Sequence, residues 1–313
     1  MLLTALLAML LVPASAFAQL QLEGPLPDLI DDDEWEVLAS FFEYERRDLS
    51  VRPVIFCTAV GQCSETEDRG EYVREKFVFE GREGTMVPGY LGLPSHRDGP
   101  HPIVILQYGF NGRMENWWDS RHPSHVLTES LLQAGFGVLT LEQPFHGDRK
   151  YEIGFSDPPS LLLSGQLSRL RDMSIQAVID VRQATDFLGS RSDVDRSRIA
   201  SVGFSQGAMH TIFLAAVDPR IRAAVSWATP MRKSDPLFYP GNFARRIVDA
   251  GVLMLGGERD PFYTAEEVET VLGLVPSTDK RLIMFDGAHQ LRPSEVTIVV
   301  EWLRDHLRGS ARP

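Results

Sequence analysis

The stretch Ile199-Ala-Ser-Val-Gly-Phe-Ser-Gln-Gly-Ala208 decides the fold that this sequence predicts. It begins with a short apolar run typical of a buried strand, and a G-x-S-x-G pattern centred on Ser205 follows directly. Gly203 and Gly207, two positions before and after the serine, leave room for a strand to turn sharply into a helix. In such a turn the serine oxygen points outward, near the free N–H groups of the helix start. The pattern therefore predicts a nucleophilic serine.

Alternating strand and helix patterns surround this stretch. Short runs of Val, Ile and Leu, separated by helical stretches, are typical of a parallel sheet that is covered by helices on both faces. The serine pattern alone also occurs in ordinary loops, so this context is what supports the turn. We expect strands at residues 103–106, 138–141, 199–202, 223–226, 252–255 and 282–285, and helices at residues 125–134, 168–188, 208–216, 265–272 and 294–307.

The sequence before residue 103 divides into a short extension and a strand-rich segment. In the extension, residues 19–52, Asp33 and Glu36 form a capping-box pattern that predicts the start of a helix. The segment that follows opens the main domain, residues 53–313, with short β-rich runs that predict antiparallel strands. The expected helix face comprises Trp35, Leu38, Phe41 and Phe42, and the expected strands are residues 54–56, 72–79 and 86–93.

The composition favours one large globular domain without a polyanionic partner. The chain has 313 residues, of which 43% are hydrophobic, enough for a single large core, with two small domains as the alternative. Its formal net charge is -12 at pH 7. Nucleic acids are bound by clustered Lys and Arg, so this acidic surplus argues against a nucleic acid as ligand. The sequence does not indicate an oligomeric state.

The first residues predict a secretory signal. Residues 1–18 carry no charged side chain and contain an apolar run, Pro13 and the small-residue pattern Ala16-Phe-Ala18. This pattern predicts cleavage before Gln19 and export to the periplasm or the medium, although the usual basic residue near the start is missing. A membrane anchor is the alternative, but the run is too short for a bilayer and Pro13 interrupts it. We expect no membrane insertion after cleavage.

The chain has two cysteines, Cys57 and Cys63. In an exported protein, an even number of cysteines close in sequence suggests a disulfide. Such a bridge would close a very short loop, so it would fix a local turn more than it would stabilise the whole fold. The spacing is not C-x-x-C and no further cysteines offer a zinc site. Two buried thiols are the alternative.

A serine nucleophile needs a general base, and the base needs a carboxylate that orients it. On a sheet of this kind the expected chain order is Ser, then Asp or Glu, then His, each in a loop after a later strand. Asp260 follows the expected strand at 252–255, and His289 follows the one at 282–285. We therefore predict a triad of Ser205, His289 and Asp260.

Other residues compete for these roles. Glu258 and Asp286 lie in the same two loops as the predicted acid and base, so either could be the acid instead. Asp260 itself precedes Pro261, and an Asp before Pro is common in turns because of its hydrogen bonds to the backbone alone. His146 is the rival base because Gln143-Pro-Phe-His-Gly-Asp148 follows a strand end. It precedes the serine in the chain, however, so we expect His146 to border the site. His306 lies within the last helix, where a surface position is expected.

The oxyanion formed during acyl transfer needs two converging N–H donors. One is expected to be the backbone of Gln206, next to the nucleophile at the helix start. The second is expected from the loop Gln107-Tyr-Gly-Phe-Asn-Gly112, whose glycines let the backbone approach a ligand closely. We choose the backbone of Phe110 as this donor, although any Gly-rich turn after a parallel strand has similar features.

Together these motifs resemble the α/β-hydrolase superfamily, and within it the dienelactone hydrolase, acetyl xylan esterase and prolyl-oligopeptidase-type catalytic domains. The resemblance covers roughly residues 86–307. It implies a mostly parallel eight-stranded sheet with helices on both faces, and it assigns the triad and the oxyanion hole to the residues named above. The chain departs from the commonest pattern at Tyr108, where relatives often carry His, and at Ala208, often Gly. The motifs are Tyr108-Gly-Phe110, Asp193-Val-Asp-Arg-Ser-Arg-Ile199, Gly203-Phe-Ser-Gln-Gly207, Gly257-Glu-Arg-Asp260 and Gly287-Ala-His289.

Two longer loops, residues 150–166 and 229–245, leave strand ends near the predicted site. Loops at that edge of a sheet normally hold binding determinants. Their apolar and aromatic residues suit an acyl or aryl group, but packing over the core explains them equally well. Three basic residues nearby, Arg149, Arg232 and Lys233, could hold an anionic substrate, but they are expected to be solvated. The candidate substrate contacts are Tyr108, His146, Trp227, Phe238 and Tyr239.

These features predict an exported serine hydrolase that cleaves carboxylic esters of small or polymer-derived substrates through an acyl-enzyme. No metal or organic cofactor is implied. A serine peptidase of the prolyl-oligopeptidase type is the nearest alternative, and a cap-dependent lipase is another. From a different class, the alternative is a catalytically inactive hydrolase fold that acts as a binding protein, although such a protein need not retain a complete triad.

Overall fold

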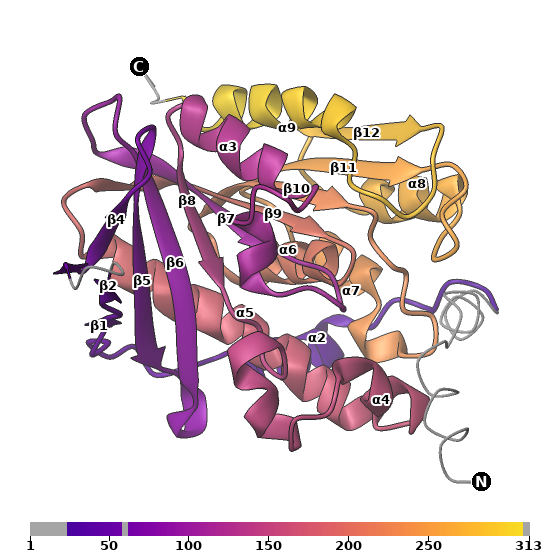
Figure 1. The fold of residues 1–313 in the computed structure, drawn as a ribbon. Helices are drawn as coiled ribbons and strands as arrows, with labels where there is room; N and C mark the ends of the chain where they lie inside the picture. Colours follow the sequence, from indigo (N-terminus) through magenta and orange to yellow (C-terminus); the bar gives the residue numbers. More distant parts are fainter. Residues whose placement is uncertain (1–23, 58–61, 309–313) are drawn as a thin grey trace, which may run out of the picture.

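The core of the structure is one large twisted sheet (Figure 1). The computed structural model describes residues 24–57 and 62–308. Ten strands join in the order β1-β5-β6-β8-β7-β9-β10-β11-β12, with β4 paired to β5. They are β1 (Arg52–Pro53), β4 (Thr66–Asp68), β5 (Tyr72–Glu80), β6 (Met86–Pro94), β7 (His101–Gln107), β8 (Gly137–Leu141), β9 (Val194–Phe204), β10 (Ile221–Trp227), β11 (Gly251–Gly257) and β12 (Lys280–Phe285).

The expectation of a mostly parallel sheet is confirmed. Six neighbouring strands, in the sheet order β8-β7-β9-β10-β11-β12, are parallel to one another. On the β8 side, β6 and β5 continue the sheet with antiparallel pairing. Every residue of β8 and of β11 is buried, as expected for strands covered on both faces. Eight strands, β5 to β12, make the body of the sheet, and the very short β1 and β4 bring its total to ten.

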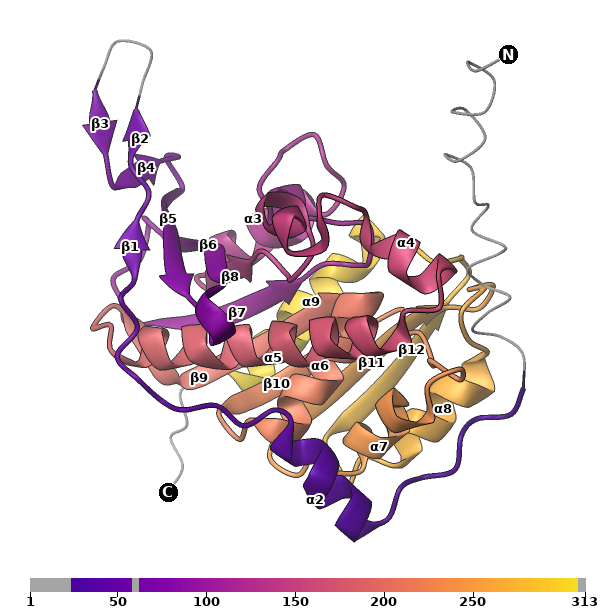
Figure 2. The ribbon, with the colours of Figure 1, turned by 90° about the horizontal axis from the view of Figure 1, so that it is seen from below.

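Helices cover both faces of this sheet. α3 (His125–Gln133) and α9 (Pro293–His306) pack against each other on one face. Figure 2, the view from below, shows the opposite face, with α5 (Leu167–Gly189) running across it. This face also holds α6 (Gln206–Val217), α7 (Pro240–Ala244) and α8 (Ala265–Gly273). Of the described residues, no helix is both long and apolar enough to cross a membrane. The predicted signal at residues 1–18 lies outside the described residues.

Shorter helices lie in the connections. They are η1 (Arg82–Gly84), η2 (Met114–Trp117), η3 (Gly147–Ile153), α4 (Pro158–Leu163) and η4 (Pro236–Phe238).

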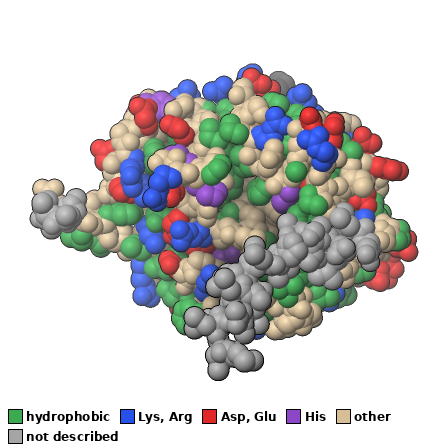
Figure 3. All heavy atoms as spheres, turned by 45° about the vertical axis from the view of Figure 1, so that its right-hand side comes forward, with side chains coloured by type: hydrophobic (Ala, Val, Ile, Leu, Met, Phe, Trp, Pro, Cys, Tyr) green, Lys and Arg blue, Asp and Glu red, His purple; other side chains and the backbone are tan. Residues whose placement is uncertain are grey.

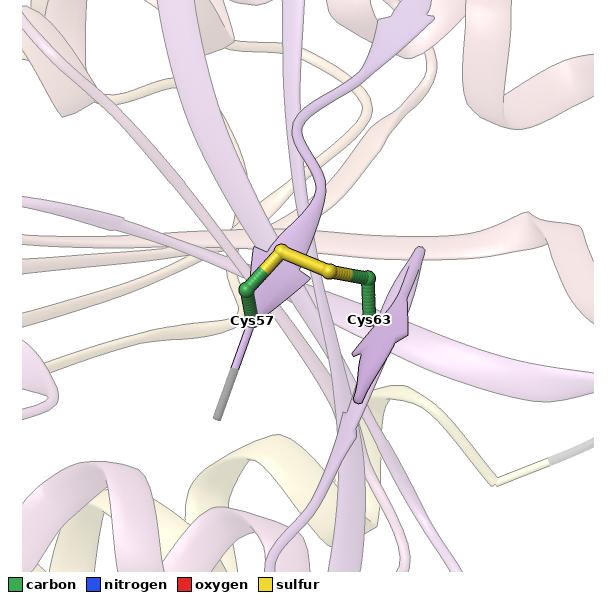
Figure 4. Close-up of a disulfide and its surroundings, with 2 residues drawn as sticks. All are labelled: Cys57 and Cys63. Carbon is green, nitrogen blue, oxygen red and sulfur yellow. A yellow bond between two sulfur atoms is a disulfide. The ribbon is translucent and has the colours of Figure 1, made fainter. Parts of the chain in front are cut away.

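Two strands differ from the sequence prediction. β9 begins at Val194, five residues before the predicted start, because the polar residues that follow Val194 lie at a partly exposed end of the sheet where strand pairing continues. The strand predicted at 54–56 does not join the large sheet. Instead β2 (Phe56–Cys57) pairs with β3 (Cys63–Ser64) in a separate two-stranded ribbon. A disulfide joins Cys57 to Cys63 across this ribbon (Figure 4), so the alternative of two free thiols is wrong.

The N-terminal helix, α2 (Asp32–Ser40), is capped by Asp31, two residues before the predicted cap, Asp33. The capping box is Asp31 with Glu34: the Asp31 carboxylate accepts the Glu34 N–H at 2.8 Å, and Glu34 accepts the Asp31 N–H at 3.0 Å. The acidic run offers several registers for such a box, and the sequence did not decide among them. Leu38 and Phe42 are buried as predicted, whereas Phe41 is 44% exposed. Phe42 packs on rings of the loop after β10, which fixes the N-terminal segment to the main body.

The turn from β9 into α6 has almost no free space. Ser205 has φ 56° and ψ -119°, a strained conformation for a residue with a side chain. A methyl group on Gly203 would clash with the backbone of Gly207, and one on Gly207 would clash with the backbone of Gln107. The pattern of two glycines therefore reflects direct backbone contact among β7, β9 and α6.

Replacing Gly203 with Ala is expected to lower the free energy of unfolding by about 3 kcal/mol, because the obstacle is backbone that cannot move aside. Gly189→Ala, at the end of α5, is the matched control: its added methyl group meets nothing within 4 Å. Denaturant unfolding should show a change of less than about 1 kcal/mol for this control. Equal unfolding midpoints for the two variants would contradict the close packing described here.

Candidate active site

Three polar side chains meet at the carboxyl-terminal edge of the parallel strands. Ser205 follows β9, Asp260 follows β11, and His289 follows β12. The His289 Nε2 lies 2.8 Å from the Ser205 Oγ, and its Nδ1 lies 2.7 Å from the Asp260 Oδ2. One imidazole therefore contacts both the hydroxyl and the carboxylate, as a triad requires.

The surroundings of Asp260 hold its carboxylate in place. Its side chain is fully buried, and its Oδ1 accepts the backbone N–H of Phe262 at 2.9 Å. The rings of Phe204 and Phe262 flank the imidazole of His289, with centroids 5.1 and 4.6 Å away. These contacts restrict the imidazole to the plane in which it bridges serine and carboxylate.

The competing acids lie away from this contact. Asp286 is 76% exposed at its side chain and pairs with Arg259 on the surface, and Glu258 is also exposed. The rival base, His146, is buried behind the loop after β7. Its Nδ1 faces the carbonyl oxygen of Pro144 at 2.7 Å, and its Nε2 faces that of Phe110 at 2.8 Å. His289 is thus the histidine at the serine, and His146 supports the loop that carries Phe110.

A cavity of about 510 Å³ opens beside Ser205 and His289. Figure 3 turns this edge of the sheet forward and shows a hollow bordered by histidine side chains, with acidic and basic groups mixed around it. Both predicted oxyanion donors, Phe110 and Gln206, line the cavity together with Ser205. The loop of Phe110 contacts the serine directly, since a methyl group on Gly109 would lie 3.1 Å from the Ser205 Cβ. Gln206 is the first residue of α6, where backbone N–H groups lack partners within the helix.

The walls of the cavity come largely from residues that the sequence did not single out. The loop at 150–166 contributes Leu162. The next helix, α5, contributes a row of apolar side chains along one of its sides. The loop at 229–245 contributes four residues. In a sequence such residues cannot be distinguished from ordinary core or surface residues, because only the fold shows that they face a cavity. Arg232 is the one wall residue among these that the sequence analysis had named; the others are Leu162, Leu167, Leu170, Met173, Met209, Pro230, Ser234, Asp235, Asn116, Trp117 and His122.

Four of the five candidate substrate contacts do not line this cavity. Trp227, Phe238 and Tyr239 are at most 2% exposed and pack in the core. Phe238 lies between the rings of Phe42 and Phe213, because the loop after β10 borders the cavity only with its first half, up to Asp235, and packs into the core with its second half. His146 lies behind the cavity wall. Tyr108 alone of the five lines the cavity, and its hydroxyl is directed away from Ser205 into a buried network described below.

The expectation that three basic residues are solvated is wrong. Arg149 is fully buried and binds Asp180 at 2.6 Å and Glu152 at 2.7 Å, which ties the segment after β8 to α5. Lys233 pairs with Glu267 on α8. Arg232 lines the cavity. Among the residues described, no cluster of three or more His, Cys, Asp or Glu side chains could share a metal ion.

A buried hydrogen-bond network connects the two predicted oxyanion donors. The Tyr108 hydroxyl contacts the Glu142 carboxylate and accepts the Gln143 N–H at 2.7 Å. The Gln143 side-chain amide donates to the Tyr108 carbonyl oxygen at 3.0 Å, and its oxygen accepts from the Gln206 side chain at 3.2 Å. Gln143 therefore links the loop of Phe110 to the start of α6. Nothing in the sequence marked Glu142 or Gln143 as partners of Tyr108.

Glu142 has an unusually high pKa within this network. Burial raises its pKa from 4.5 to about 7, more than the hydrogen bond from Tyr108 lowers it. Burial and the neighbouring Glu142 also raise the pKa of Tyr108 well above its ordinary value. One carboxylate oxygen, Oε2, has no hydrogen-bond partner among the described residues. A buried carboxylate with an unpaired oxygen costs stability when it is ionised.

Replacing Glu142 with Gln is expected to stabilise the protein at alkaline pH. Because the pKa of Glu142 rises on folding, the folded state binds more protons than the unfolded state between 4.5 and about 7. The stability that Glu142 costs therefore grows as the pH rises through this window. We expect the difference in unfolding free energy between Glu142→Gln and wild type to grow by about 2 kcal/mol from pH 5 to pH 8 in urea titrations.

Glu83→Gln makes the same chemical change at an exposed carboxylate and should show no such growth. A pH-independent difference between Glu142→Gln and wild type would contradict the buried ionisation.

Comparison with known proteins supports the same superfamily. "Putative hydrolase YtaP" of Bacillus subtilis (strain 168) is 28% identical over 167 residues, which are 51% of this chain and 54% of that protein. "Putative carboxymethylenebutenolidase" of Escherichia coli O157:H7 is 30% identical over 192 residues, 60% of this chain and 66% of that protein. The chain thus matches about half of the first relative's length and slightly less than two thirds of the second's.

The fold and the family agree. The structure of an acetyl xylan esterase from Paenibacillus sp. R4 superimposes with a TM-score of 0.66 at 18% identity, over 93% of this chain and 99% of that one. The sequence model of the family described as "Acetyl xylan esterase (AXE1)" matches residues 65–231, a range that includes Ser205 but ends before Asp260 and His289. This chain, an α/β-hydrolase by fold, belongs to the acetyl xylan esterase (AXE1) family.

Proposed function

We propose that this protein is a serine esterase that hydrolyses carboxylic esters through an acyl-enzyme. The single observation that carries the proposal is the hydrogen-bonded path from Asp260 through His289 to Ser205, with 2.7 and 2.8 Å contacts at the wall of a cavity. The family match supports ester hydrolysis as the reaction. It covers Ser205 alone of the three, so the roles of Asp260 and His289 rest on the geometry.

In the proposed mechanism, Ser205 attacks the ester carbonyl while His289 takes its proton through Nε2. Asp260 accepts the Nδ1–H of His289, which fixes the tautomer and stabilises the imidazolium that forms. His289 then gives the proton to the leaving alcohol. Water attacks the acyl-enzyme with His289 again as the base, and the acid product leaves.

The oxyanion is proposed to bind the backbone N–H groups of Phe110 and Gln206. The start of α6 adds a partial positive charge beside Ser205, which favours a developing negative charge there. The Gln143 side chain is well placed to keep the two donors at a constant separation, since it hydrogen-bonds to both segments. Such preorganisation is what makes an oxyanion hole effective.

The family name suggests acetyl esters of a sugar polymer as one substrate class, and the 28–30% identical relatives suggest other hydrolytic substrates. The cavity has mostly apolar walls near Ser205, which suits a short acyl or aryl group. Because the matching family is one of esterases, esters are proposed in preference to peptides.

Ser205→Ala and His289→Ala are each expected to lower kcat/KM for nitrophenyl acetate by more than about 10³-fold, because the nucleophile or its base is lost. Ser190→Ala, an exposed serine at the end of α5, is the matched control and should keep the wild-type rate. A series of nitrophenyl esters of increasing acyl length should show the best turnover for short chains. Full activity in Ser205→Ala, or robust peptide cleavage with negligible ester turnover, would contradict the proposal.

We also propose that the protein is exported and that residues 1–18 are removed. The Cys57–Cys63 disulfide supports this, since disulfides form and persist mainly in oxidising compartments. N-terminal sequencing of the protein recovered from the periplasm or the medium should begin at Gln19. Recovery of uncleaved protein from the cytosol with free thiols would contradict export.

A further inference from the structure

The charged lining of the cavity consists of one cation and one carboxylate. Of the Lys, Arg, Asp and Glu side chains described, those of Arg232 and Asp235 alone border it. Both come from the loop that joins β10 to η4, on the same cavity as Ser205 and His289. The remaining lining is apolar or uncharged apart from the histidines. A substrate that enters this cavity therefore lies beside Arg232.

Arg232 is held in place from several sides. Its side chain is 8% exposed, its Nη1 donates to the Ser174 hydroxyl of α5 at 3.2 Å, and its Nη2 lies 3.4 Å from the Asp235 Oδ2. The guanidinium also lies over the ring of Phe238, 5.6 Å from its centroid. The backbone of Arg232 has φ 53°, a conformation that is uncommon for a residue with a side chain. A buried cation in a strained backbone conformation needs a reason beyond chance.

The negative charge around Arg232 does not balance the positive charge. Asp235 is 1% exposed and already forms a bidentate ion pair with Arg171 of α5, at 2.7 to 3.0 Å. Two guanidinium groups thus share one carboxylate, which leaves a net charge of about +1 beside the cavity. His210 lies nearby and adds no negative charge, and burial lowers its pKa.

Burial is also the largest cause that lowers the pKa of Arg232 itself, and the like charge of Arg171 acts in the same direction. The guanidinium remains a cation at neutral pH. Its environment is therefore one in which an additional anion would be favourable. A ligand carboxylate would supply the missing negative charge in the bidentate geometry that guanidinium prefers.

We propose that Arg232 forms an anion subsite through which the enzyme selects esters that carry a carboxylate group. The inference rests on the proposed esterase function, because it assigns the substrate class of that same cavity. The carboxylate belongs to either the acyl chain or the alcohol of the ester. Both kinds of substrate present a carboxylate to Arg232. After hydrolysis that carboxylate remains on the acid product in the first case and on the alcohol product in the second.

Two ester pairs distinguish these sources. The first compares 4-nitrophenyl hydrogen glutarate with neutral 4-nitrophenyl pentanoate, so that the charge lies on the acyl chain. The second compares 4-acetoxybenzoate with its methyl ester, so that the charge lies on the alcohol. Wild type is expected to prefer the charged member of one pair. Arg232→Gln should lower kcat/KM for that member by at least about tenfold and change the neutral member by less than about threefold.

Arg259→Gln is the matched control. It removes the same charge from an exposed side chain that pairs with Asp286 outside the cavity lining, so it should keep the wild-type preference. If Arg232→Gln fails to fold, Arg171→Gln decides the question. That variant leaves the cavity lining unchanged and lets Asp235 neutralise Arg232, so the preference for the charged ester should fall. An unchanged preference in Arg171→Gln would then overturn the subsite.

The outcomes separate this inference from the proposed function. Hydrolysis that depends on Ser205, with the same charged-to-neutral ratio in wild type and Arg232→Gln, would overturn the subsite and leave the esterase intact. If wild type cleaves none of these esters, the esterase proposal fails. The subsite is then tested separately, by measuring the binding of glutarate with isothermal titration calorimetry. Glutarate binding that is lost in Arg232→Gln would support the subsite, and no binding to wild type would overturn it.

Discussion

The close backbone contact between β9 and α6 is the constraint on which the rest of this structure depends. No side chain fits between Gly203 and Gly207, or between Gly207 and the end of β7, so three segments meet backbone to backbone. This contact fixes Ser205 in a strained conformation at the sheet edge and brings the loop of Phe110 against it. The large buried core supplies the stability that maintains such strain.

Polar groups buried around this turn also cost stability. Glu142, Arg149 and Arg232 lie at most 6% exposed, and each is held by partners on neighbouring segments. Their positions are informative: Glu142 supports the loop of Phe110, Arg149 ties the segment after β8 to α5, and Arg232 borders the cavity. Buried charges close to a cavity are more informative about function than the apolar walls, because an apolar core of the same volume would be at least as stable.

The sequence predicted the central sheet well because its strands are continuous apolar runs, and it predicted the meeting of Ser205, Asp260 and His289 because chain order and strand ends determine their positions. It failed where the outcome depends on how a loop folds back. Trp227, Phe238 and Tyr239 entered the core instead of the cavity, and the acidic run at 31–34 offered more than one register for a helix cap. Arg232 was expected in solvent, since a sequence cannot show that its loop lies under α5.

The account as a whole requires that Ser205 be the most reactive hydroxyl of the protein. The direct measurement is mass spectrometry after treatment with a fluorophosphonate, which forms a stable adduct with an activated serine. We expect a single adduct, on the peptide that contains Ser205, and much slower labelling in His289→Ala. An adduct on a different residue, or ester turnover by a protein that the reagent does not label, would contradict the account.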